Sequence, residues 1–108
     1  MAPYEVDCVI VHYRSGGAVN DLLTGLATQA DVLMQTFVVE CGDDGSLRGV
    51  DTRPATTVID PGQNLGYCAG NNVGVAAGTA PYVLVANPDT RPVAADVVSR
   101  PAWCSCTK

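Results

Sequence analysis

The stretch VDCVIVHYRSGG, residues 6–17, decides the fold class of this chain of 108 residues. Its first eight residues form a nearly continuous apolar run rich in valine and isoleucine, which is typical of a strand buried on both faces of a parallel sheet. The segment RSGG then ends the strand, and apolar residues follow at helical spacing over residues 18–30, with Ser15 or Asn20 able to cap the helix. A strand followed directly by a helix predicts the start of a β-α-β unit.

The same alternation continues along the chain. Further strands are expected at residues 36–40 (beginning as early as Val32), 56–60 and 81–86, and further helices at residues 64–78 and 92–98. Residues 41–54 have a loop composition. This order predicts an α/β fold: a Rossmann-like arrangement of three layers, α/β/α, around a mainly parallel four-stranded sheet.

Composition and charge narrow the classes of protein. Apolar residues make up 47% of the chain and charged residues 16%, which suits a folded domain, expected over residues 1–98 and followed by an unpatterned tail, 99–108. A net charge of −5 with scattered basic residues argues against nucleic-acid binding. We expect no transmembrane segment and no signal peptide. Five cysteines, an odd number, favour free thiols in a reducing cytoplasm.

Polar clusters follow all four expected strands. They begin at His12, Glu40, Asp60 and Asn87. Because the carboxyl ends of parallel strands meet at one edge of the sheet, and ligands bind there where the strand order reverses, these clusters predict a binding site. Part of the pattern is automatic, since loops are polar in any protein.

Each candidate residue has a structural alternative. Asp89, in the turn Asn87-Pro88-Asp89-Thr90, suits Mg²⁺ or Mn²⁺ held together with ligand phosphates, but spacing alone favours a simple turn or helix cap. Glu40 can bind a ribose or base, whereas Asp43 and Asp44 equally suit a solvated turn. The polar and glycine residues at the start of the second helix favour either a polar ligand or close packing on the sheet: Asn64, Gly66, Gly70, Asn71 and Asn72.

Four segments together resemble family 2 glycosyltransferases of the GT-A fold, in particular the bacterial rhamnosyltransferase-like branch. The segments are VDCVIVHYRSG (6–16), TFVVECGDDGS (36–46), GQNLGYCAGNNVGV (62–75) and YVLVANPDT (82–90). The third is similar to the family's NxGxxxGNNxG segment, and the fourth to its metal-binding strand end. The resemblance covers residues 6–98 and identifies the chain with the amino-terminal, nucleotide-sugar-binding half of that fold.

The resemblance implies an inverting, metal-dependent transferase that uses a dTDP-, UDP- or GDP-linked sugar with Mg²⁺ or Mn²⁺. By position, Tyr13, Glu40 and Asp44 would contact the base and ribose. Asn64, Gly66 and Asn71 would lie near the nucleotide or sugar, and Asp89 would bind the metal with Asn87 beside it. The acceptor in the family is a glycan or a lipid-linked glycan of the cell wall. A cytoplasmic protein, free or peripheral to the inner face of the membrane, is expected.

The chain also departs from the family. Glu40-Cys41 replaces the usual Asp-Asn, and the loop that follows is one residue shorter. The resemblance therefore does not identify which nucleotide is bound. From about Val97 the ending VVSRPAWCSCTK no longer resembles the family, which predicts a truncated form that keeps the donor site but lacks the acceptor site and general base. The alternative is a nucleotide-binding module or pseudoenzyme. Truncation would leave an edge on the strand at 81–86, through which the chain would self-associate.

Overall fold

The computed structural model describes residues 4–14, 16–42, 47, 50, 53–90 and 92. Its elements, in chain order, are β1 (Tyr4–His12), α1 (Gly16–Leu26), β2 (Val32–Glu40), β3 (Thr56–Ile59), α2 (Gly66–Ala77) and β4 (Tyr82–Val85). The alternation of strands and helices is therefore confirmed. The helix expected at 92–98 and the candidate Asp44 lie outside the described residues.

The helix bounds differ from those expected. α1 ends at Leu26 and not at Ala30, because the chain tightens there: Thr28 and Gln29 donate their N–H groups to the carbonyls three residues before them. Asp31, with a φ of 60°, then turns the chain into β2. α2 begins at Gly66, two residues later than expected, because Asn64 is occupied in the turn before the helix.

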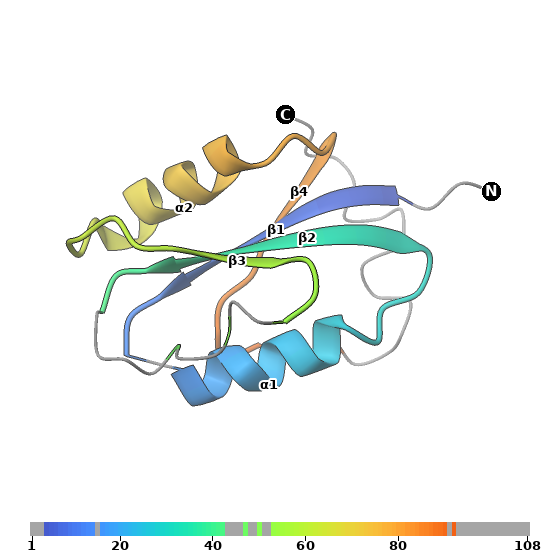
Figure 1. Ribbon diagram of the computed structural model, residues 1–108, viewed down its shortest axis with the longest axis horizontal. Coiled ribbons are helices and arrows are strands. Elements are labelled where there is room, and N and C mark those ends of the chain that lie inside the picture. The colour runs from blue at the N-terminus through green and yellow to red at the C-terminus, as the bar shows by residue number, and fades with distance from the viewer. Residues whose placement is uncertain are drawn as a thin grey trace.

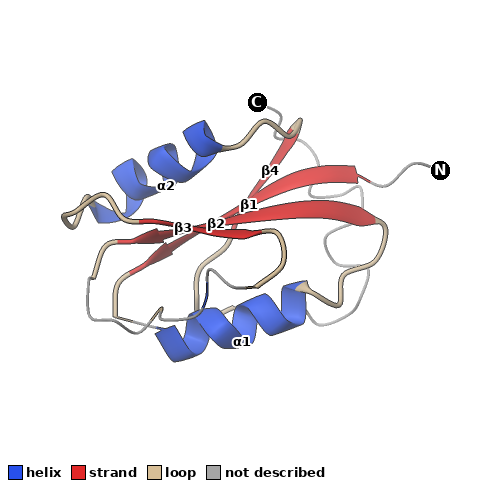
Figure 2. Ribbon diagram, viewed as in Figure 1, coloured by secondary structure: helices blue, strands red, loops and turns tan. Residues whose placement is uncertain are grey.

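The four strands form one parallel sheet in the order β3-β2-β1-β4. The first strand of the chain is thus central, and the strand order reverses beside it. Figures 1 and 2 show α1 covering one face of the sheet and α2 the other, which gives three layers, α/β/α. The predicted α/β fold with a parallel sheet is confirmed.

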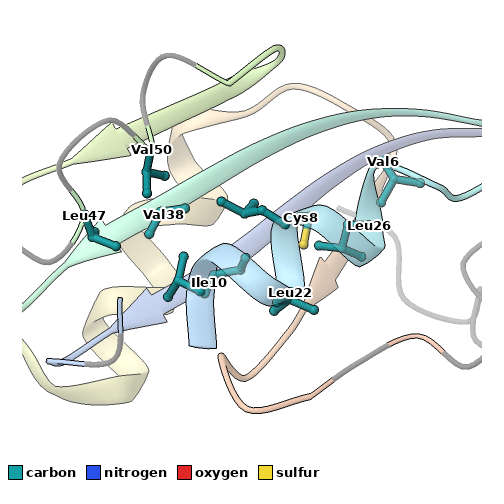
Figure 3. Close-up of a cluster of buried hydrophobic side chains, with 10 residues drawn as sticks. Val6, Cys8, Ile10, Leu22, Leu26, Val38, Leu47 and Val50 are labelled. Carbon is teal, nitrogen blue, oxygen red and sulfur yellow. The ribbon is translucent and has the colours of Figure 1, made fainter. Parts of the chain in front are cut away.

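The larger core lies between the sheet and α1. Alternate residues of β1 face this helix, namely Val6, Cys8 and Ile10, and all three are fully buried. They pack with Leu22 and Leu26 of α1 (Figure 3). Val38 of β2 and the buried Leu47 and Val50 close the same cluster. Burial of β1 on both faces explains why its sequence is a continuous apolar run.

The opposite face of β1 meets α2 through glycines. Gly70, Gly74 and Gly78 follow one another at every fourth position, and a Cβ added to each would meet Val11, Val9 and Asp7 of β1 in turn. The missing side chains let the helix lie close against the strand. Asp7 is buried at the end of this row, and its Oδ2 accepts a hydrogen bond of 3.0 Å from the N–H of Ala80.

Within the described part of the chain, β4 is an edge strand that pairs with β1 alone. Its residues are partly exposed, and Val85 is 43% exposed. No helix among the described residues is long and apolar enough to cross a membrane.

Candidate functional site

The carboxyl ends of the strands form one edge of the sheet, which we call the carboxyl rim. The strand order reverses there between β1 and β4, and both helices begin at this end. A groove of about 380 Å³ opens at this point, and we call it the rim groove. It is lined by Val11, Ala18, Tyr67, Asn87, Pro88 and Asp89. In open α/β sheets this is the position at which ligands bind.

The turn after β4 brings two predicted site residues, Asn87 and Asp89, into the rim groove. The carbonyl oxygen of Asn87 accepts hydrogen bonds from the N–H and the hydroxyl of Thr90, at 3.1 and 2.6 Å, and this closes the turn. The side chains of Asn87 and Asp89 are exposed. The turn that spacing alone favoured is therefore present, and it also presents a carboxylate to the groove.

The segment before α2 is shaped by Asn64. Its Oδ1 accepts a hydrogen bond of 3.0 Å from the N–H of Gly66, whose φ of +77° suits glycine. Asn64 and Gly66 therefore build the turn and are not among the residues that line the rim groove. The residue that does line it is Tyr67, which is 50% exposed. Sequence reasoning missed Tyr67, because its spacing matched the apolar positions of the helix.

Asn71, the remaining candidate in α2, does not line the rim groove. Its Oδ1 is buried and has no hydrogen-bond partner among the described residues. A buried acceptor without a donor costs about 1–3 kcal/mol, so this atom is a place where a donor would stabilise the fold. The neighbouring Gly70 packs on Val11, as the structural alternative for this segment predicted.

Glu40 and His12 lie side by side at the carboxyl ends of β2 and β1, since the two residues pair in the sheet register. Both are buried, with His12 Nε2 at 3.5 Å from Glu40 Oε1. The same carboxylate oxygen accepts a hydrogen bond of 2.8 Å from the N–H of Gly42. Glu40 thus stabilises the fold through these contacts, and its buried side chain exposes little surface to a ligand.

Tyr13, directly beyond β1, is exposed by 56% and accessible at the carboxyl rim. The guanidinium carbon of Arg14 lies 5.7 Å from the centre of its ring, in a cation–π contact. Arg14 has a φ of 53°, and its backbone nitrogen lies beside Gly42. The exposed ring of Tyr13 can stack on a planar ligand group.

The rim groove offers few protein ligands to a metal. Asp89 is its only carboxylate, and no group of three or more metal-ligating side chains occurs among the residues that the structure describes. This donor set fits Mg²⁺ or Mn²⁺ only if the ligand brings phosphate oxygens, which is how such ions commonly bind: one or two carboxylates, with water and phosphate completing the shell.

The sequence matches no protein-family model and no curated protein. The structure is similar to a mannosyltransferase, PcManGT of Pyrobaculum calidifontis, in complex with GDP-Man and Mn²⁺ (TM-score 0.78, 19% identity, 87% of this chain and 30% of the other). It is also similar to TarS of S. aureus, residues 1–349, in complex with UDP (TM-score 0.75, 20% identity, 88% and 30%) and with UDP-GlcNAc (0.69, 22%, 79% and 26%). The chain spans about a third or less of these proteins, and within that span it has a glycosyltransferase-like α/β fold.

Proposed function

We propose that this chain binds a nucleoside-diphosphate sugar at the carboxyl rim, as the donor-binding part of an inverting glycosyltransferase. The observation that carries the proposal is the rim groove, which lies where the strand order reverses and contains the carboxylate of Asp89. The neighbours in complex with GDP-Man, UDP-GlcNAc and UDP support this choice of ligand. UDP-, GDP- and dTDP-linked sugars are the donors to test.

Asp89 is the residue that we assign to a divalent metal, and Asn87 lines the same groove. When bound, such an ion supplies Lewis-acid chemistry at the diphosphate. The side chains of the protein would hold and orient the donor. Asp89 and Asn87, which line the groove, would face the diphosphate, and the exposed ring of Tyr13 would meet the base. Glu40 would contribute to the nucleoside site by accepting the hydrogen bond from the N–H of Gly42.

A second candidate is a nucleotide-binding module that transfers no sugar. Transfer requires a general base close to the acceptor hydroxyl. Among the described residues, Asp89 is the only titratable carboxylate that lines the rim groove, and the metal would occupy it. Release of sugar from a donor that binds separates the two candidates.

The proposal is tested by thermal unfolding of the full chain with UDP, GDP and dTDP, each with and without Mn²⁺. A ligand at one hundred times its Kd stabilises the native state by about 2.7 kcal/mol. In a domain of this size, each kcal/mol raises Tm by about 4–8 °C. We expect at least one nucleotide to raise Tm, and Mn²⁺ to increase that shift.

The matched variants exchange a carboxylate for an amide of the same shape. Asp89→Asn should remove the Mn²⁺-dependent part of the shift. Asp31→Asn, an exposed position before the amino end of β2, should leave the shift unchanged, and its φ of 60° is one that asparagine tolerates. The proposal fails if no nucleotide raises Tm, and the metal assignment fails if Asp89→Asn keeps the full effect of Mn²⁺.

A further inference from the structure

Tyr67 is a half-exposed aromatic side chain in the first turn of α2, and it shares the rim groove with Asp89. A single exposed ring is common at protein surfaces, and what distinguishes Tyr67 is that it lines a groove together with a carboxylate. The row of glycines fixes where this ring stands, because Gly70 and Gly74 press the helix against Val11 and Val9 of β1. Tyr67 is thus held beside the groove by a closely packed helix.

The rim groove is lined partly by apolar and partly by polar side chains. Val11, Ala18 and Pro88 are apolar and join the ring of Tyr67, whereas Asn87 and Asp89 bring polar side chains. A pyranose also has apolar and polar surfaces, since its C–H groups form an apolar face and its hydroxyl groups point outward. The volume of about 380 Å³ falls within the ~300–1,000 Å³ of small-molecule sites.

The order of the strands separates the two ends of the proposed donor. Tyr13 follows the central strand β1, and Glu40 ends β2 on one side of it, whereas Asp89 follows β4 on the other side. A donor with its base at Tyr13 and its diphosphate at Asp89 therefore runs from β1 toward β4. The sugar is bonded to the diphosphate, and Tyr67 lines the same groove as Asp89.

We infer that the ring of Tyr67 is the surface on which the sugar of the donor packs, and that Tyr67 helps to distinguish a nucleotide sugar from a free nucleotide. This inference rests on the proposed function and deepens it. The ring contacts the apolar face of the sugar.

The test compares two ligands of one nucleotide by isothermal titration calorimetry in Mn²⁺: UDP-glucose with UDP, GDP-mannose with GDP, and dTDP-rhamnose with dTDP. We expect Tyr67→Ala to weaken binding of the nucleotide sugar by about 2- to 12-fold and to leave binding of the free nucleotide unchanged. Tyr67→Phe, which keeps the ring, should behave as the wild type. Leu33→Ala, an exposed apolar residue in the amino-terminal half of β2, is the control for a general loss of side-chain area.

The outcomes separate the inference from the function on which it rests. If Tyr67→Ala weakens binding of the nucleotide sugar and of the free nucleotide equally, Tyr67 contacts the nucleotide and the inference is wrong. The inference is also wrong if Tyr67→Ala changes neither affinity. If the wild type binds neither ligand, the proposed function itself fails. Should Tyr67→Ala unfold, Tyr67→Leu keeps the apolar volume without the ring, and the same difference between the two ligands is expected.

Discussion

The contact between α2 and β1 depends on Gly74, and alanine at this position should loosen it. The added Cβ would overlap Cγ1 of Val9, which is fully buried and, being β-branched, cannot turn aside. Overfilling a packed site costs about 1–3 kcal/mol, occasionally more. Alanine recovers up to about 1 kcal/mol because it favours the helix more than glycine does. The net expectation is a loss of about 1–2 kcal/mol, or a Tm lower by roughly 4–16 °C.

The assay is thermal and urea unfolding, followed by circular dichroism, of Gly74→Ala beside two other glycine-to-alanine variants. Gly17→Ala is the control, because it also lies in a helix and nothing stands within 4 Å of the added Cβ. It should be neutral or slightly stabilising. Gly70→Ala, with the nearest carbons of Val11 at 3.0 Å, should fall between them. If Gly74→Ala is as stable as Gly17→Ala, α2 does not depend on this contact and the reasoning is refuted.

Two further predictions concern the thiols and the sheet edge. Burial raises the pKa of the Cys8 thiol from 9.0 to about 12. The unfolded chain therefore loses this proton at a lower pH than the folded chain, and the free energy of unfolding should fall by about 1.4 kcal/mol per pH unit between these two values. Cys8→Ala should remove this slope in urea unfolding at stepped pH, and an unchanged slope would contradict the assignment. The edge of β4 should make the chain self-associate as its concentration rises, and Val85→Lys, at an exposed position of that strand, should reduce this association. A monomer at high protein concentration, measured by light scattering, would contradict this prediction of self-association.

The fold could be predicted from the sequence because buried positions are occupied by apolar residues. The apolar run of β1 reflects two covered faces, and each break in apolar spacing marked a boundary to within a few residues. The end of α1 was harder to predict. It depends on the tight turn that precedes Asp31, which has no signature as clear as a glycine or a proline.

The site was less accessible to sequence reasoning, because it depends on which strands become neighbours. Asn87 and Asp89 were found through the position of their turn, and the structure brings both into one groove. Tyr67 was overlooked, since only the three-dimensional arrangement shows that its ring leaves the helix surface toward that groove. The burial of Glu40 was also hidden, because its partner His12 lies in a different strand and meets it only through the register of the sheet.

The groups assigned to the donor all lie at or beyond the last residue of a strand, or in the first turn of a helix. The buried parts of the strands and the glycines of α2 supply rigidity. Substitutions at Tyr13, Tyr67 or Asn87 can therefore alter ligand preference while the buried framework keeps its packing, since these three side chains are exposed. A fold arranged in this way can acquire new specificities at little cost to its stability, because the residues that change and those that hold the protein together are different residues.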